Sequence, residues 1–211
     1  MDKEKCSDSY QTELSERLIK LEWQAFDKVQ NIGRRAGCQD DWETFLVMRK
    51  SQYMTWTVEM LESYIMDFEI ANSLGRNLIA EKYGWMMEST DKESFLEIKD
   101  SLPVISAEKR NIIEGIVAIQ VGWMEEWAEK YPKAAMRTRS IHTGEDSLYN
   151  TSYETYLRGE LSTYSDRTLE LYGRFVVGFF RDGKNLAEAI IGNSAKLYGY
   201  FSMENLEKGL R

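Results

Sequence analysis

The sequence predicts an all-α protein, and three observations support that prediction. Apolar residues recur at helical spacing along most of the 211 residues, and no segment shows the sustained alternation of a strand. Only two prolines occur, Pro103 and Pro132, and their scarcity permits long uninterrupted helices. Glycines and capping residues stand where the apolar patterns stop. We therefore expect a single helical domain, a bundle spanning 1–211.

The first part of the chain predicts three helices. Leucines at helical spacing indicate a first helix over 10–32, and Gly33 ends it as a left-handed stop. After a short polar loop the pattern continues over 40–74 as one second helix. Gly75 breaks that pattern before a third helix over 76–87.

The second part repeats this rhythm after a short linker. A linker helix is expected over 91–102, followed by a long helix over 107–131. A polar loop then covers 133–150. Helical pattern resumes over 151–182, and the last helix is expected over 184–201.

Polar residues at the starts of these segments are the expected N-caps. A short polar side chain there accepts hydrogen bonds from the first free backbone N–H groups of a helix. Asp40, Thr90 and Thr151 are each followed three residues later by glutamate, as in a capping box. Ser106 is the expected cap of the long middle helix, and a break is expected near Ser165.

The two parts of the chain resemble copies of one unit. The matched blocks occur in the same order in both parts: 19–23 with 119–123, 42–46 with 153–157, 61–64 with 169–172, and 75–78 with 183–186. We therefore predict two pseudo-symmetric three-helix repeats, over about 10–88 and 106–203. The alternative is two helical hairpins that share stop signals because helices generally do.

Charge and cysteine usage exclude several classes of protein. With 27 basic and 35 acidic residues, the formal charge is −8, and no basic run offsets it, so we expect no nucleic-acid partner. The start lacks the apolar stretch of a signal peptide, and no segment is long enough to span a membrane. Cys6 and Cys38 do not form a disulfide framework. These features predict a cytoplasmic protein without a membrane partner, and they leave its oligomeric state open.

Arg49 falls inside an aromatic stripe of the second predicted helix, beside Gln52 and Trp56. A guanidinium in such a place is costly unless it is paired and hydrogen-bonded. Asp41, Glu59 or a carboxylate from the other half could pair with it. Two interpretations stay open: a structural ion pair, or a two-pronged grip on the carboxylate or phosphate of a ligand.

The loop before this helix gathers Arg35, Cys38, Asp40 and Asp41. A thiol ahead of a helix N-terminus is activated by the helix dipole and by a nearby arginine. The two aspartates oppose a thiolate, and no histidine lies nearby in the sequence. Cys38 is therefore expected first as a small buried packing residue and only second as a nucleophile. The weak catalytic candidates are Cys38, Asp40, Asp41, Glu43 and Glu154.

The second polar loop and the helix after it have the same mixed character. Arg139 lies in the loop, and Tyr156, Arg158 and Glu160 follow on the helix. The Glu-x-x-His pairs of di-metal bundles are absent and the chain has one histidine, His142, so we expect no metal site. The sequence identifies no cofactor and contains no glycine-rich phosphate loop.

Two stretches resemble an uncharacterised bacterial family, the domain of unknown function numbered 4125. They are 38–53, which reads Cys-Gln-Asp-Asp-Trp-Glu-Thr-Phe at its start, and 153–164. The resemblance spans roughly 14–201. The family pattern has Gly-Gly-Arg-Ala before the cysteine, whereas this chain keeps the arginine as Arg35 and replaces the second glycine by Arg34. The resemblance implies membership, a helical fold and polar clusters shared by the family, but no activity.

The leading hypothesis is a small-molecule binding protein or enzyme with a polar site between the two repeats. The ligand would be anionic or zwitterionic, and whether the chain is an enzyme stays open. The predicted ligand-binding residues are Arg35, Arg49, Gln52, Trp56, Arg139, Tyr156, Arg158 and Glu160. The alternative is a protein–protein interaction or scaffold module without catalytic activity, expected to expose an apolar or aromatic patch.

Overall fold

The computed structural model describes residues 2–30 and 35–210, with side chains from residue 9 onward, and every regular element in these ranges is helical. The α-helices are α1 (Asp2–Asp27), α2 (Trp42–Tyr53), α3 (Val58–Ser73), α4 (Leu78–Thr90), α5 (Lys92–Ile98), α6 (Ala107–Lys130), α7 (Pro132–Ala135), α8 (Tyr153–Thr163), α9 (Asp166–Arg181), α10 (Leu186–Leu197) and α11 (Met203–Gly209). Short 3-10 turns lie at Gly37–Asp40, Lys99–Ser101 and Thr143–Glu145. The all-α prediction is confirmed.

Several predicted boundaries were wrong. The single helix expected over 40–74 is two helices, α2 and α3, because the chain turns at 54–57 and Thr57 caps a new helix. The first helix ends at Asp27 and does not continue through 28–30, and the stop expected at Gly33 lies outside the described residues. The segment expected over 184–201 ends at Leu197 before α11. The break expected near Ser165 is confirmed, since Ser165 caps α9.

The capping predictions were partly right. Ser106 caps α6 as expected, with its side chain accepting a hydrogen bond from the Lys109 N–H. At three other starts the cap is the next residue along the chain. Asp41, Asp91 and Ser152 cap α2, α5 and α8, where Asp40, Thr90 and Thr151 were expected.

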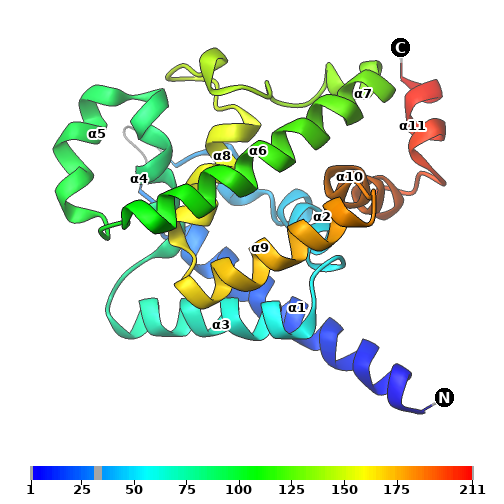
Figure 1. Cartoon of the computed structure of the whole chain (residues 1–211), viewed down its shortest axis with the longest axis horizontal. Coiled ribbons are helices and arrows are strands. Elements are labelled where there is room, and N and C mark those ends of the chain that lie inside the picture. Colours follow the sequence, from blue (N-terminus) through cyan, green and yellow to red (C-terminus); the bar gives the residue numbers. More distant parts are fainter. Residues whose placement is uncertain (1, 31–34, 211) are drawn as a thin grey trace.

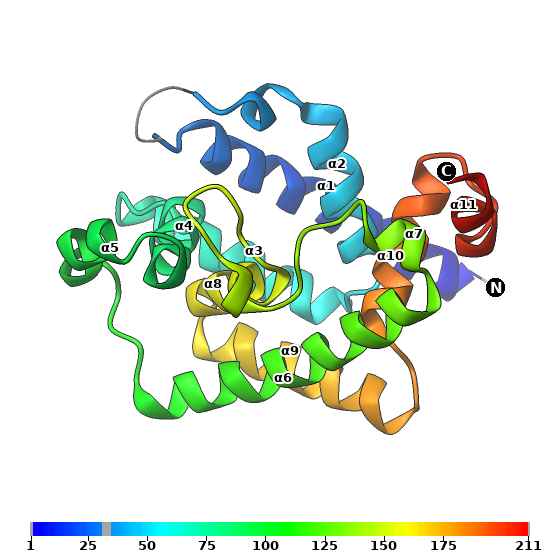
Figure 2. The ribbon, with the colours of Figure 1, turned by 90° about the horizontal axis from the view of Figure 1, so that it is seen from above.

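α8 lies in the middle of the molecule in both ribbon views, whereas α3 runs along the bottom edge in the view of Figure 1 (Figures 1 and 2). α4 packs on α8, α2 on α10, α1 on α3, and α6 on both α8 and α9. α3 also packs on α9, so the first and second halves of the chain share one core. α5 lies at one end of the molecule and α11 at the other, in both views (Figures 1 and 2).

The core is rich in aromatic side chains. Tyr53, Trp56, Tyr64, Tyr164 and Tyr172 are all almost fully buried and pack edge to face or tilted against one another. Aromatic pairs in these geometries contribute about 0.5–1.5 kcal/mol each beyond their burial. Their rings come from α2, α3 and α9 and from the turns between α2 and α3 and between α8 and α9. The aromatic core therefore joins the two parts of the chain.

Candidate functional site

Four charged side chains meet in the interior beside this aromatic core: Glu22 of α1, Arg49 of α2, Lys82 of α4 and Glu160 of α8. All four are buried, with at most 8% of the residue exposed. Their formal charges cancel. We call them the central quartet.

Arg49 is the hub of the central quartet. Its Nε and Nη2 donate to the two carboxylate oxygens of Glu22 at 2.8 and 2.6 Å, a bidentate pair. Nη1 and Nη2 also donate to Glu160 at 3.3 Å, and Nη2 donates to the Tyr53 hydroxyl at 2.8 Å. Lys82 Nζ donates to Glu160 Oε2 at 2.6 Å. Each charge is paired, which is the condition under which buried ions are tolerated.

The two carboxyl groups of the quartet differ in their pKa. Burial raises the pKa of Glu22, against the opposing charge of Arg49. Burial also acts on Glu160, but there the charges of Arg49 and Lys82 together outweigh it and hold the pKa well below the usual range. Because Glu160 has two cations and Glu22 has one, Glu22 is the carboxyl of the pair that takes up a proton more readily.

Polar neighbours complete the coordination of Glu160. Gln52 Nε2 and the Tyr164 hydroxyl each donate to Glu160 Oε1 at 3.2 Å. Trp56 lies next to Tyr164, is 1% exposed and belongs to the aromatic core. Three of the expected ligand-binding residues, Arg49, Gln52 and Glu160, therefore do lie together, but they bind one another in the interior. Trp56 likewise presents almost no surface to a ligand.

A close approach of two helices brings Lys82 to Glu160. A Cβ atom added to Gly159 of α8 would lie 2.7 Å from Met86 Cγ and 2.9 Å from the carbonyl oxygen of Lys82. Only glycine leaves room for this contact between α8 and α4. The small residue thus determines how near the Lys82 ammonium comes to the carboxylate of the next residue, Glu160.

The central quartet reaches the surface at Tyr156. Lys82 Nζ lies 3.6 Å from the centroid of the Tyr156 ring, and the Arg139 guanidinium carbon lies 4.5 Å from the same centroid. Lys82 is buried, whereas Arg139 is exposed on the loop that crosses over α8 in Figure 2. The half-buried Tyr156 ring therefore contacts one cation of the interior and one of the surface.

Tyr156 also has a shifted acidity. Burial alone would raise its pKa, but the positive charges of Lys82 and Arg49 outweigh burial and lower the pKa of the phenol. The neighbouring Tyr83 of α4 behaves oppositely, because burial and the nearby Tyr156 and Cys38 raise its pKa. Tyr156 is therefore the more acidic of these two neighbouring phenols.

Both polar loops contribute to this surface. Cys38 lies in the loop before α2, close enough to act electrostatically on Tyr83, and Arg139 lies in the loop before α8. Cys38 is exposed, so the expectation of a buried packing residue was wrong. We call Cys38, Tyr83, Arg139 and Tyr156 the Tyr156 face.

Arg139 differs from the other candidate arginines. Within the described residues it has no carboxylate at ion-pair distance, and its Nη1 donates to the carbonyl oxygen of Thr151 at 3.0 Å. Arg35 pairs with Asp27 and Asp40 on the surface, at 2.5 and 2.8 Å. Arg158 pairs with Glu114 and Glu154, at 2.8 and 2.7 Å.

The remaining acidic candidates have structural contacts or face solvent. Asp41 caps α2 by accepting from the Thr44 N–H at 3.0 Å, and that hydrogen bond lowers the pKa of Asp41. Glu154 accepts from the Thr143 N–H at 2.8 Å and so ties the second polar loop to α8. Glu43 is exposed. None of these carboxylates belongs to the Tyr156 face.

Sequence reasoning missed Glu22, Lys82 and Tyr83. Glu22 interrupts the apolar positions of α1, and Lys82 lies between the buried Ile79 and Met86 on α4. A charged residue on an apolar helical face is the same signal that singled out Arg49. Tyr83 gives no such signal, because a tyrosine on a helix is ordinary core material.

No group of three or more histidine, cysteine, aspartate or glutamate side chains in 2–30 and 35–210 is placed to hold a metal ion. Among the same residues, no helix has both the length and the apolar character needed to cross a membrane.

The sequence was compared with family models, curated proteins and solved structures. A model described as a protein of unknown function, DUF4125, matches residues 12–208. The chain belongs to this family. No curated protein and no solved structure matches the chain. The match to DUF4125 covers the residues of the central quartet and of the Tyr156 face.

Proposed function

We propose that this chain binds a small anionic or zwitterionic molecule at the Tyr156 face and that Tyr156 exchanges a proton with it. One observation carries the proposal: the Tyr156 ring contacts the buried Lys82 and the exposed Arg139, and its phenol has a lowered pKa. Arg139 would hold the anionic group of the ligand, since within the described residues it pairs with no carboxylate.

The central quartet supports this site from behind. Lys82 is fixed by Glu160, which is in turn held by Arg49. A buried and fully paired network keeps the ammonium beside the Tyr156 ring with little freedom to move, as a pre-organised site requires. The role of Arg49 is then positional, and the contact with the ligand falls to Arg139 and Tyr156.

The same proposal includes a duplication of one helical unit, in which α1, α2, α3 and α4 correspond to α6, α8, α9 and α10. The helix contacts support it, because each packed pair has a counterpart: α4 on α8 with α10 on α2, and α1 on α3 with α6 on α9. Since the second predicted helix is divided in two, the proposed unit has four helices instead of three.

Backbone details support the duplication as well. Gly75 and Gly183 are both left-handed, with φ of 70° and 65°, and follow α3 and α9. The side chains of Asn77 and Asn185 cap α4 and α10 and donate to backbone carbonyl oxygens of α1 and α6, at Ala25 and Trp123. Gln11 of α1 and Lys109 of α6 donate to the carbonyl oxygens just before the caps of α3 and α9.

This correspondence puts the central ion pair on the pseudo-symmetry axis. With Trp42 matched to Tyr153 at the starts of α2 and α8, Arg49 is matched to Glu160. These two residues bind each other, at 3.3 Å. The proposed site then lies where the two units meet, and the loops before α2 and α8, which supply Cys38 and Arg139, are equivalent connectors.

Calorimetry on the full chain with inorganic phosphate and with succinate tests the binding step. We expect one of these anions to bind and Arg139→Ala to weaken that binding about tenfold or more, as for loss of a charge-assisted hydrogen bond. Arg181→Ala, an exposed arginine of α9, is the matched control and should leave binding unchanged. The proposal would be contradicted if neither anion binds and native mass spectrometry detects no retained small molecule.

A spectroscopic titration tests the role of Tyr156. Tyrosine ionisation followed at 295 nm should contain one component below the usual pH range, and Tyr156→Phe should remove it. Lys82→Met should shift that component to higher pH, because it removes the charge that lowers the pKa. If Tyr156→Phe leaves the earliest component in place, the proton-transfer role is wrong.

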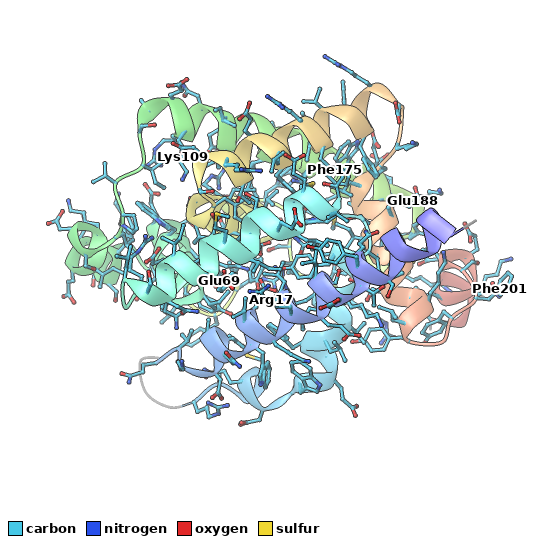
Figure 3. All side chains as sticks on the ribbon, turned by 90° about the horizontal axis from the view of Figure 1, so that it is seen from below. Arg17, Glu69, Lys109, Phe175, Glu188 and Phe201 are labelled. Atoms are coloured by element: carbon cyan, nitrogen blue, oxygen red, sulfur yellow. The ribbon has the colours of Figure 1, made fainter. Side chains whose placement is uncertain are left out.

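The second candidate function is an interaction module. It is supported by exposed aromatic residues between α10 and α11, Tyr198, Tyr200 and Phe201, of which Phe201 is 89% exposed and points away from the body of the molecule (Figure 3). The anion experiment separates the two candidates. An interaction module would bind neither anion, and Arg139→Ala would change nothing.

A further inference from the structure

A concave surface lies between α1 and α2, apart from the Tyr156 face. It is a cavity of about 440 Å³ that is partly open to solvent. Small-molecule pockets typically measure about 300–1,000 Å³ and are mostly apolar with a few polar groups. The cavity is therefore of a size to hold a small organic molecule.

The floor of this cavity is apolar. Ile19 of α1 is 1% exposed, and Trp42 and Leu46 of α2 are half-buried beside it. Met54, just after α2, also lines the cavity and is 49% exposed. Trp42 and Leu46 lie one helical turn apart on the same side of α2, so together they offer a continuous apolar strip. This strip would bury the hydrocarbon body of a ligand.

The rim of the cavity carries more positive than negative charge. Lys20 of α1 and Lys50 of α2 are both exposed and both line it, against one carboxylate, Glu16. Within the described residues, neither lysine is paired with a carboxylate. The chain as a whole has a net charge of −8, so two unpaired lysines beside one apolar cavity make this part of the surface locally positive.

We propose that the cavity between α1 and α2 binds an amphipathic monoanion, a molecule with a hydrocarbon body and one carboxylate. The body lies on Trp42, Leu46 and Ile19, and the carboxylate lies between Lys20 and Lys50. The apolar floor accounts for the hydrocarbon, and the charge of the rim selects an anion over a cation. This site is independent of the proposed function, because it shares no residue with the Tyr156 face.

A single side chain, Tyr53, connects the cavity to the central quartet. Tyr53 lines the cavity, and its hydroxyl accepts a hydrogen bond from Arg49 Nη2 at 2.8 Å. Tyr53 is itself fully buried, so a ligand seated on the α2 strip lies over a residue that the quartet holds in place. Occupancy of the cavity stabilises the arrangement of α1 against α2 in which Arg49 reaches Glu22.

Calorimetry with decanoate below its critical micelle concentration tests the site on the full chain, with decanol and decyltrimethylammonium as neutral and cationic analogues. We expect decanoate to bind at one site and at least fivefold more tightly than either analogue. Lys50→Glu should weaken decanoate binding by fivefold or more and remove its advantage over the cation. Lys99→Glu, an exposed lysine far along the chain, makes the same change in net charge and should not alter binding.

Two further variants test the position of the hydrocarbon. Leu46→Trp fills the cavity and should abolish decanoate binding. In the unmodified chain, 11-bromoundecanoate should quench part of the tryptophan fluorescence, and Trp42→Phe should remove that quenching. Far-UV circular dichroism establishes whether each variant is folded. If Leu46→Trp does not fold, Lys50→Glu, at an exposed position, still tests the site. No decanoate binding, binding of decanol as tight as that of decanoate, or binding unchanged by Lys50→Glu would overturn the proposal.

Discussion

Arg49 and Arg139 make the same kind of contact in opposite surroundings. Each guanidinium lies over a tyrosine ring, Arg49 at 5.2 Å from the centroid of Tyr53 and Arg139 at 4.5 Å from that of Tyr156. Arg49 is 8% exposed and bound to two carboxylates, whereas Arg139 is exposed and, within the described residues, bound to none. The residue type is shared, and burial with pairing decides whether the charge is held by the fold or stays exposed to solvent.

The two arginines also differ in how much their removal is expected to lower the free energy of unfolding. Removing one partner of a buried charge network leaves other charges uncompensated, at a cost of about 3–5 kcal/mol. Removing an exposed guanidinium costs about 0–1 kcal/mol. The three predictions below test the buried side of this comparison, beginning with the largest effect.

The largest effect is expected for Arg49→Ala. The free energy of unfolding should fall by about 3–5 kcal/mol, because Glu22 and Glu160 stay buried with only Lys82 to compensate them. Urea denaturation followed by circular dichroism measures the change. Arg174→Ala removes an exposed arginine paired within α9 and should cost less than about 0.5 kcal/mol. Equal losses for the two variants would abolish the distinction between buried and exposed arginines.

The next effect is a pH dependence carried by Glu160. Its pKa is lower in the folded state than in the unfolded chain, where about 4.3 is usual, so its stabilising contribution is present above pH 5 and lost as pH falls. Burial raises the pKa of Glu22, so its contribution has the opposite sign and is lost as pH rises. Glu160→Gln should therefore flatten the acid side of the stability profile by about 1–3 kcal/mol.

Urea denaturation at half-unit steps between pH 3 and pH 7 measures that profile. Glu170→Gln removes an exposed carboxylate of α9 and should leave the slope as it is in the unmodified chain. A Glu160→Gln profile as steep as that of the unmodified chain would show that other carboxylates cause the acid sensitivity.

The smallest of the three effects concerns the contact between α4 and α8. Gly159→Ala places a Cβ atom against Met86 and the Lys82 carbonyl oxygen and should destabilise the protein by about 1–3 kcal/mol. Gly178→Ala, in α9 with no atom within 4 Å of the added Cβ, should instead stabilise it by about 0.5–1 kcal/mol. Thermal and urea unfolding give both values. A stabilising Gly159→Ala would mean that the two helices separate without cost.

The helical fold follows from local features of the sequence. Apolar periodicity, scarce proline and the stops at Gly75 and Gly183 act within a few residues, and both glycines do adopt the left-handed conformation expected of a stop. The capping side chains were located to within one residue for the same reason. Information of this kind is contained in a short window of chain.

The turn between α2 and α3 was not visible in the same way. The apolar pattern continues through 54–57, so periodicity alone indicated one long helix. In the structure, Gln11 of α1 donates to the carbonyl oxygen of Trp56 at 2.7 Å and satisfies a group that the break leaves free. A residue forty-five positions away therefore takes part in ending the helix.

By itself, the sequence determined that the chain is helical, where glycine stops two of its helices, and that Arg49 needs a partner, either a carboxylate of the chain or an anionic group of a ligand. Only the tertiary structure decided that the partners are Glu22 and Glu160, that Lys82 joins them, and that Arg139 reaches Tyr156. Helix formation depends on neighbours within a turn or two, whereas charge pairing depends on which helices pack together. The packing of α4 on α8 and of α2 on α10 is a property of the whole chain.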